Sequence, residues 1–374
     1  MGSRTRQVRV GDVPIGGGAP VSVQTMGNVD PHDARACLAQ LTACAELGCD
    51  LFRLTVPDVE AARTLGEVRK ASPIPIVADI HFDHRCALAA IDAGADALRL
   101  NPGNIGGRER VAEVARAAKA RGVPIRVGVN GGSLERDLDA AVRGGAMTRP
   151  QALAESALRH LKTLEDEGLR EVVISAKASN AVETVETYRL LAERTDCPLH
   201  LGVTEAGTLI PGTVRSSVAL GILLNEGIGD TIRVSLTGKP EKEVKVGLEI
   251  LRSLGLRSPG PAITSCPTCG RTKVDLVRIA SQVEDALETL YRDPARWPAG
   301  QSGNPNNLNN RTMRRFPKVA VMGCAVNGPG EAKDADIALC GGDGEFLLYV
   351  RGKQVGKVTE SEAIGKVVEY ALSL

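Results

Sequence analysis

Three cysteines in the C-terminal third of the chain are spaced as metal ligands are. Cys266 and Cys269 form a Cys-X-X-Cys pair, and Cys324 follows within the segment GCAVNGPGE. Such a pair alone fits a zinc knuckle, a thioredoxin-like redox pair or two ligands of an iron–sulfur cluster. It follows a Pro-rich segment and not the first strand of a βαβ unit, which disfavours the thioredoxin-like interpretation.

The fourth ligand separates the two metal alternatives. Structural zinc usually takes four Cys or His ligands, yet the chain beyond residue 255 has no histidine and only one further cysteine, Cys340. Three thiolates with one other ligand suit a 4Fe–4S cluster that has one distinct iron. The Gly-Pro-Gly turn before Glu331 can fold the chain back toward Cys324. The spacing favours the 4Fe–4S cluster and leaves zinc with Cys340 as the alternative.

A second group of reactive side chains lies in the first two thirds of the chain, in eight short apolar runs. The runs are residues 21–26, 51–56, 74–80, 97–103, 124–130, 171–177, 199–205 and 231–237. Helix-like stretches such as 32–48, 107–121, 150–167 and 179–194 separate them. Alternating strands and helices predict a parallel sheet, and eight units fit a TIM (β/α)8 barrel. An open doubly wound sheet is the main alternative, but no Gly-X-Gly-X-X-Gly follows the first strand.

Five cations stand on these strands near their carboxyl ends, where barrel enzymes place their chemistry. They are Arg53, Arg99, Arg126, Lys177 and Arg233. Side chains two residues apart share a strand face, so the cations should converge on one mouth. Asp79 and Glu205 could pair with two of them. Two of the remaining unit charges about 6 Å apart would repel by roughly 3 kcal/mol at an effective dielectric of ~20. Salt-bridged scaffolding is one interpretation; a bound polyanion such as a diphosphate is favoured.

The pattern changes after residue 254. A Gly/Pro-rich linker, a helix at 274–292, a strand before Cys324 and a C-terminal helix predict a small α+β domain. We therefore expect a barrel at 1–254 and a cluster domain at 255–374. Residues 293–315, rich in Pro, Asn, Gly and Arg, predict a loop insertion.

Composition excludes several classes of protein. Lys plus Arg (46) balances Asp plus Glu (45), which leaves no broad basic face for nucleic acid. No apolar run is long enough for a membrane helix, and the N-terminus lacks the apolar core of a signal peptide. We expect a cytoplasmic protein with reduced thiols. Five cysteines should then be buried apolar side chains: Cys37, Cys44, Cys49, Cys86 and Cys197.

Long motifs, taken in order, resemble one bacterial enzyme family. They include VADIHFDHRCAL, ALRLNPGNIG, PIRVGVNGGSLE, ISAKASN, LGVTEAG, CPTCGRT and GCAVNGPGEAKDADI. Together they closely resemble the IspG (GcpE) family, the 4-hydroxy-3-methylbut-2-enyl diphosphate synthases of the non-mevalonate isoprenoid pathway. The resemblance covers about residues 5–291 and 317–374.

The resemblance implies a reaction and an architecture. The family reductively opens 2-C-methyl-D-erythritol 2,4-cyclodiphosphate to the linear allylic diphosphate with loss of water. Electrons arrive singly through a 4Fe–4S cluster from flavodoxin or ferredoxin. A TIM barrel is followed by a domain that resembles the cluster domain of sulfite and nitrite reductases, and the enzyme is a homodimer.

The resemblance also implies residue roles. The cluster ligands would be Cys266, Cys269, Cys324 and Glu331. The substrate ligands would be Arg99, Arg126, Asn130, Lys177, Thr204, Arg233, Ser235 and Asn327. Glu205 would be the acid/base that helps an oxygen leave as water. A substrate oxygen would displace the carboxylate of Glu331 from the distinct iron of the cluster. Arg53, Asp79 and His81 would position these groups, and a buried, hydrogen-bonded His81 without a functional role is the alternative.

Three features depart from the family pattern. The stretch between Cys269 and Cys324 is longer than usual, Cys340 replaces a small residue, and Gly27 replaces a hydroxyl residue. Two other classes of protein stay open as alternatives. One is a pterin-type TIM-barrel transferase with a structural zinc site, and the other is an iron–sulfur electron carrier or redox sensor.

Overall fold

The computed structural model describes residues 5–257, 262–292, 317–326 and 328–374 of the chain. The chain divides into two compact units, Met1–Arg257 and Ser258–Leu374. The insertion expected at 293–315 lies outside the described residues. Within the described residues, no helix is long and apolar enough to cross a membrane.

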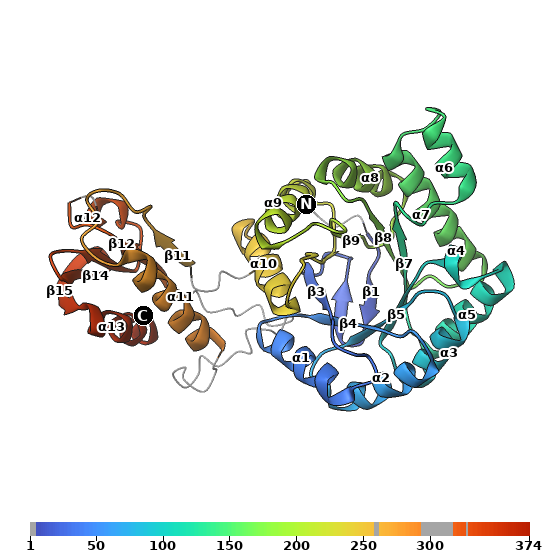
Figure 1. Cartoon of the computed structure of the whole chain (residues 1–374), viewed down its shortest axis with the longest axis horizontal. Helices are drawn as coiled ribbons and strands as arrows, with labels where there is room; N and C mark the ends of the chain where they lie inside the picture. The colour runs from blue at the N-terminus through green and yellow to red at the C-terminus, as the bar shows by residue number, and fades with distance from the viewer. Residues whose placement is uncertain (1–4, 258–261, 293–316, 327) are drawn as a thin grey trace. The chain divides into compact units, whose positions relative to one another are not determined.

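The N-terminal unit is a ring of eight parallel strands surrounded by helices (Figure 1). The strands are β3 (Ser22–Met26), β4 (Leu51–Thr55), β5 (Ile76–Ile80), β6 (Ala97–Leu100), β7 (Ile125–Asn130), β8 (Val172–Lys177), β9 (His200–Leu201) and β10 (Thr231–Ile232). β10 pairs with both β9 and β3, and a bridge from Ile174 to Leu199 closes the ring. The predicted TIM barrel is confirmed.

Helices follow the barrel strands and begin at residues that cap them. They are α1 (Ala34–Glu46), α2 (Val59–Ala71), α3 (His84–Asp92), α4 (Pro102–Ile105), α5 (Arg108–Arg121), α6 (Arg136–Arg143), α7 (Arg149–Asp166), α8 (Ala181–Arg194), α9 (Leu209–Asn225) and α10 (Pro240–Ser253). Asp33 and Asp58 accept hydrogen bonds from backbone N–H groups of α1 and α2, and Thr148 forms a capping box with Gln151. The apolar faces of these helices cover the barrel. Cys37, Cys44, Cys49, Cys86 and Cys197 are all buried, as predicted.

A hairpin covers the amino-terminal end of the barrel. It consists of β1 (Val8–Val10) and β2 (Val13–Ile15), joined through Gly11 in the left-handed region. A side chain at Gly11 would come within 2.9 Å of Pro75, which precedes β5. The hairpin therefore occupies the end of the barrel opposite the strand carboxyl ends and leaves that mouth free.

Two barrel strands are shorter than the sequence predicts. The expected strands at 199–205 and 231–237 each reduce to two paired residues, in β9 and β10. Beyond them the chain turns away, since Thr204 N–H donates to Ala178 O at 2.9 Å and Thr237 N–H donates to Gly207 O at 2.9 Å. The segments that carry Thr204, Glu205 and Ser235 are therefore loops at the mouth.

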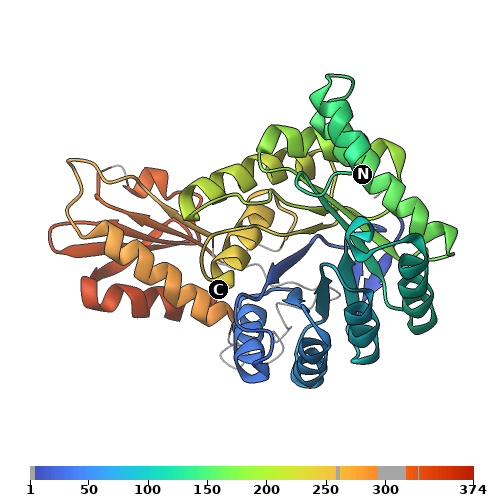
Figure 2. The ribbon, with the colours of Figure 1, turned by 45° about the vertical axis from the view of Figure 1, so that its right-hand side comes forward.

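The C-terminal unit is a five-stranded mixed sheet with helices on both faces (Figure 2). Its strands are β11 (Ala262–Ser265), β12 (Lys318–Met322), β13 (Ile337–Gly341), β14 (Glu345–Val350) and β15 (Lys353–Thr359). α11 (Leu276–Arg292) and α13 (Glu360–Ser373) pack on one face through Val283, Leu287 and Val367. The short α12 (Gly328–Glu331) contributes to the other face, beside Met322 and Cys340. The predicted α+β class is confirmed.

Candidate functional site

The register of the barrel strands brings the predicted cations together. Arg99 on β6 pairs in register with Asp79 on β5 and with Arg126 on β7, and Asn130 pairs with Lys177 on β8. Arg126 extends across the barrel to β3, where its Nη1 donates to Gln24 Oε1 at 2.6 Å. The cations thus come from separate strands and share one interior, as period-2 reasoning predicts.

Asp79 is the carboxylate at the centre of one side of this group. It is fully buried, with Oδ1 3.3 Å from Arg99 Nη1 and Oδ2 3.7 Å from Arg53 Nη2 and 3.6 Å from His81 Nε2. Burial alone would raise the pKa of the Asp79 carboxyl, but Arg53, Arg99 and His81 outweigh it and lower this pKa below its usual value. Asp79 is therefore an anion that neutralises part of the charge of its neighbours.

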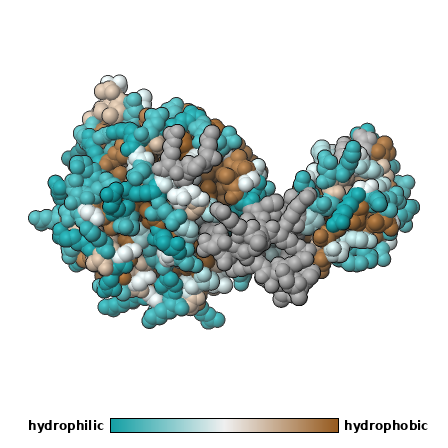
Figure 3. Space-filling view, turned by 180° about the vertical axis from the view of Figure 1, so that it is seen from behind, coloured by the Kyte–Doolittle hydropathy of each residue, from teal (hydrophilic) through white to brown (hydrophobic). Residues whose placement is uncertain are grey.

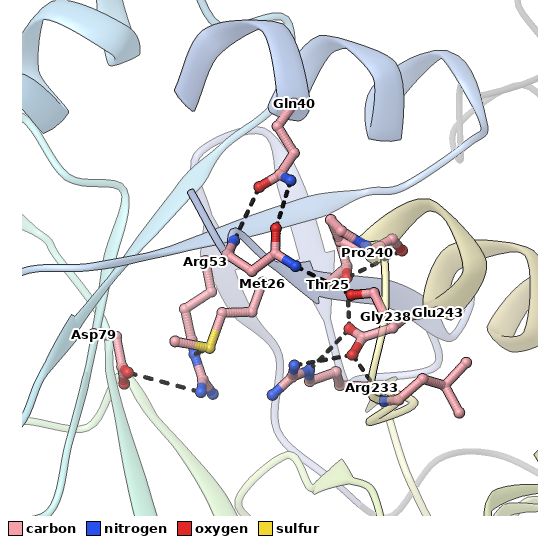
Figure 4. A network of polar contacts seen from close by, with 11 residues as sticks. Thr25, Met26, Gln40, Arg53, Asp79, Arg233, Gly238, Pro240 and Glu243 are labelled. Atoms are coloured by element: carbon pink, nitrogen blue, oxygen red, sulfur yellow. Dashed lines mark hydrogen bonds and ion pairs between the residues drawn. The ribbon is translucent and has the colours of Figure 1, made fainter. Parts of the chain in front are cut away.

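A second carboxylate, Glu243, was not selected from the sequence. It lies in the first turn of α10, is 4% exposed and forms an ion pair with Arg233. Figure 4 shows its carboxylate between Thr25 and Arg233, with the Asp79–Arg53 pair nearby. Glutamate is common in the first turn of a helix because it complements the helix dipole. Because its position in the helix already explains this glutamate, the sequence gives no sign that it also pairs with Arg233.

Two of the five cations, Lys177 and Arg126, form no ion pair with a carboxylate among the described residues. Lys177 lies across Gly202, where an added Cβ would come within 2.7 Å of Nζ, and Arg99 lies similarly over Gly128. Burial and the surrounding arginines lower the pKa of Lys177 well below its usual value. Burial, Arg53 and Arg99 do the same to the pKa of Arg126. Both groups would bind a proton more strongly beside an anion.

The charge count of this interior is positive. Arg53, Arg99, Arg126, Lys177 and Arg233 face Asp79 and Glu243, so five cations minus two carboxylates leave three positive charges. A buried histidine in the same interior, His200, has its pKa lowered well below the usual value by burial, Arg126 and Lys177. It is neutral and adds no charge. Such an excess is suited to an anion with several charged oxygens.

The remaining predicted residues surround the mouth. Asn130 Oδ1 accepts from Gly132 N–H at 3.2 Å. Glu205 is exposed and has a left-handed backbone with φ of 53°. Such a backbone costs a non-glycine residue of order 1–3 kcal/mol, and strained backbones of this kind cluster at functional sites. Glu205 is thus free to meet a ligand from the rim.

The thiols of the C-terminal unit gather at one end of its sheet. Cys266 follows β11 and Cys324 follows β12, and these strands are adjacent and parallel. Gly323 N–H donates to Cys266 Sγ at 3.2 Å. Cys269 is exposed, and hydrogen bonds from Arg271 lower the pKa of its thiol. A lowered pKa favours the thiolate, which is the form that binds metal.

Cys340 differs from the three predicted ligands. It is fully buried, and a side chain at Gly328 would meet its Sγ at 3.0 Å. Burial raises the pKa of Cys340 to about 12, with smaller contributions from Cys324 and Cys266. Cys340 is therefore a packed thiol and a poor metal ligand, which weakens the zinc alternative.

The ligand set itself is only partly described. Among the described residues, no three His, Cys, Asp or Glu side chains form a ready metal site. Asn327 lies outside the described residues, and Glu331 is described only as the last backbone position of α12. The thiol chemistry and the Gly323 N–H donor fit an iron–sulfur cluster, and Glu331 stays a prediction.

Comparisons with known proteins agree across the whole chain. Residues 5–248 match the GcpE TIM-barrel domain, and residues 262–372 match the GcpE protein C-terminal domain. A 4-hydroxy-3-methylbut-2-en-1-yl diphosphate synthase (flavodoxin) of Geobacter sulfurreducens is 50% identical over 362 residues, 97% of this chain and 95% of the relative. The protein of that name from Maridesulfovibrio salexigens is 51% identical over 359 residues, 96% of this chain and 93% of the relative.

The similarity of this chain to solved structures is weak. A dihydropteroate synthase of Yersinia pestis has a TM-score of 0.46 and 12% identity, covering 67% of this chain and 98% of that chain. The similarity is too low to support the pterin-type alternative.

The charge of Asp79 should be measurable in the pH dependence of stability. Because its pKa is lowered in the folded protein, its stabilising effect is present above the usual carboxyl pKa and is lost as pH falls through the folded-state pKa. We expect Asp79→Asn to lower the melting temperature at neutral pH, with the gap closing below about pH 4. Calorimetry across this range tests it. Asp92→Asn, which breaks an exposed pair with Arg121, should change little, and a gap for Asp79→Asn that is constant with pH would contradict the assignment.

Proposed function

Because the chain belongs to the GcpE family of 4-hydroxy-3-methylbut-2-en-1-yl diphosphate synthases, we propose that its barrel binds 2-C-methyl-D-erythritol 2,4-cyclodiphosphate and that its C-terminal unit holds a 4Fe–4S cluster. The chain is an oxidoreductase of the non-mevalonate isoprenoid pathway and forms 4-hydroxy-3-methylbut-2-enyl diphosphate. This activity decides against the pterin-type transferase and the non-enzymatic electron carrier.

One observation carries the assignment of the substrate site. Three positive charges remain in the barrel interior after Asp79 and Glu243 are counted. The cyclic diphosphate, with one negative charge on each phosphate, would offset two of them and accept hydrogen bonds from Arg99, Arg126, Lys177 and Arg233. Asn130 and Ser235 would complete its ligands at the mouth. Binding energy at the phosphates would then hold the reacting carbons in place.

The rim supplies the groups that act on the carbon skeleton. Ring opening takes up two electrons and two protons and breaks two C–O bonds. One break frees an end of the diphosphate from the carbon skeleton, the other releases a hydroxyl oxygen as water, and a C=C bond forms between the two carbons. We assign the proton on the departing oxygen to Glu205, whose carboxyl is exposed beside Thr204. Thr204 would contact the skeleton, and Asn327 would be a further substrate ligand.

The cluster would be held by Cys266, Cys269, Cys324 and Glu331. When bound, a group of this kind supplies single electrons and a Lewis-acidic iron. The Gly323 N–H donor supports this assignment, since hydrogen bonds to the sulfurs tune such centres. The electron donor would be flavodoxin, which the names of the relatives specify, with ferredoxin as the alternative.

A homodimer is part of the proposal, and helix α9 supports it. Ile210, Val214, Val218 and Ile222 lie four residues apart on one face and are 75, 55, 47 and 40% exposed. Figure 3 shows hydrophobic surface on this part of the barrel unit. The one charged side chain of α9, Arg215, donates back to Ala206 O. An uncharged apolar stripe of this length is typical of a protein–protein contact, and a second copy would present a matching stripe.

Metal analysis is the primary test of the cluster. Anaerobically purified or reconstituted protein should contain about four iron and four sulfide per chain, with a broad visible absorption band that the cyclic diphosphate perturbs. Cys269→Ser should lose the band, whereas Cys340→Ala should keep it. A colourless or zinc-loaded wild type after reconstitution would refute the cluster.

Steady-state kinetics of the holoenzyme should separate the two sets of residues. Lys177→Met removes a charge-assisted contact worth ~1.5–3 kcal/mol, so KM should rise about tenfold or more. Glu205→Gln keeps the shape of the side chain and removes its proton transfer, so kcat should fall while KM changes little. If Glu205→Gln raised KM and Lys177→Met left KM unchanged, these roles would be rejected.

Sedimentation tests the dimer. Val214→Glu places a charge in the apolar stripe of α9 and should yield a monomer at concentrations where the wild type is dimeric. Val182→Glu, at a 68% exposed position on α8, is the matched control and should stay dimeric. A Val214→Glu variant that sediments like the wild type would exclude α9 as the contact.

A further inference from the structure

The part of the barrel that carries Arg233 has few backbone hydrogen bonds. β10 pairs with β3 over two residue pairs, Thr231 with Ser22 and Ile232 with Val23, and with β9 over two more. Arg233 N–H still donates to Leu201 O at 3.0 Å, and the next backbone bond of this segment is Thr237 N–H to Gly207 O. The sheet alone therefore does not fix the segment that holds Arg233 and Ser235.

Glu243 makes up for the missing sheet bonds. Its Oε1 accepts from Arg233 Nη2 at 3.1 Å and from Leu236 N–H at 2.9 Å. Its Oε2 accepts from Arg233 Nε at 3.2 Å and from Thr25 Oγ1 at 2.7 Å. One buried carboxylate thus joins β3, the segment after β10 and α10 (Figure 4).

The contact fixes the orientation of the guanidinium of Arg233. Nε and Nη2 form one edge of the group, and Glu243 occupies that edge with both of its oxygens. Within the described residues, no hydrogen bond of Nη1 is found. A guanidinium is planar and rigid, so holding one edge aims the other. The free edge carries the donors that could meet phosphate oxygens.

We propose that Glu243 is a positioning residue for substrate binding, which orients Arg233 toward the diphosphate and holds Leu236 so that Ser235 stays beside it. This inference rests on the proposed diphosphate site. Glu243 itself does not touch the substrate. Its effect on binding is transmitted through Arg233.

Glu243→Gln tests the proposal with little change of shape. The glutamine oxygen can still accept from Leu236 N–H, and Thr25 can accept from the new amide. The amide N–H groups would face the Nε–H of Arg233, so the two-point contact is lost. We expect the KM of the cyclic diphosphate and the dissociation constant of inorganic pyrophosphate to rise about tenfold, with kcat within about threefold of wild type. Unchanged binding would overturn the proposal.

Glu226→Gln is the matched control. Glu226 forms a comparable two-point contact with Arg189 on the outer surface, so the same chemical change there should leave pyrophosphate binding intact. An equal loss in both variants would show a general effect of stability and would overturn the specific role.

Two further variants separate positioning from charge. Arg233→Lys keeps the charge but loses the planar edge, so it should weaken pyrophosphate binding about as much as Glu243→Gln. In an Arg233→Met background, Glu243→Gln should have no further effect, because the residue through which it acts is absent. Wild-type binding by Arg233→Lys, or a full additional loss in the double variant, would refute the mechanism.

The outcomes also distinguish this inference from the proposed function. A wild type that binds neither pyrophosphate nor the cyclic diphosphate refutes the diphosphate site and this inference with it. A wild type that binds both while Glu243→Gln binds equally well refutes the positioning role alone.

Discussion

The barrel unit is organised around five cations that share an interior with two carboxylates. In water these charges would scarcely interact, but in a partly buried site each close pair of like charges costs several kcal/mol. Asp79 reduces the cost on one side, through Arg53 and Arg99, and Glu243 reduces it on the other, through Arg233. Lys177 and Arg126 keep strongly lowered pKa values in this environment. The interior thus has an excess of positive charge that suits an anion, and a diphosphate offers both negative charge and several hydrogen-bond acceptors.

Local backbone features follow from the same requirement. Glycines stand where long cationic side chains must lie flat, as Gly128 does beneath Arg99 and Gly202 beneath Lys177. Arg126 is held deeper, by Gln24 across the barrel, so it borders the site from below. The short β9 and β10 release the loops that carry Thr204, Glu205 and Ser235 to the mouth. These loops lack the hydrogen bonds of a sheet and can contact a ligand. The hydrogen bonds of Glu243 to Arg233 and Leu236 hold one of them in place.

In the C-terminal unit, three thiols lie at least partly exposed at one end of the sheet. Cys266 and Cys324 leave adjacent parallel strands at the same end of a sheet, and Cys269 follows in an exposed turn. Cys340 lies on a strand within the sheet and is packed among Met322, Ala338 and Gly328. The same residue type is therefore ready for metal binding at the sheet end and inert inside, because burial disfavours the thiolate.

The sequence by itself determined the class of fold, the family and the groups of residues that could do chemistry. Alternation of strands and helices requires a parallel sheet, and period 2 places Arg99, Arg126 and Lys177 on the inner face. The spacing of Cys266, Cys269 and Cys324 indicated a metal centre, and long motifs identified the family. Only the tertiary structure decided how the charges are paired. Glu243 meets Arg233 and Thr25 because α10 packs back against β3, a contact over 218 residues that no local pattern encodes. It also decided where β9 and β10 end, since pairing length depends on neighbouring strands and loops and not on the apolar runs themselves.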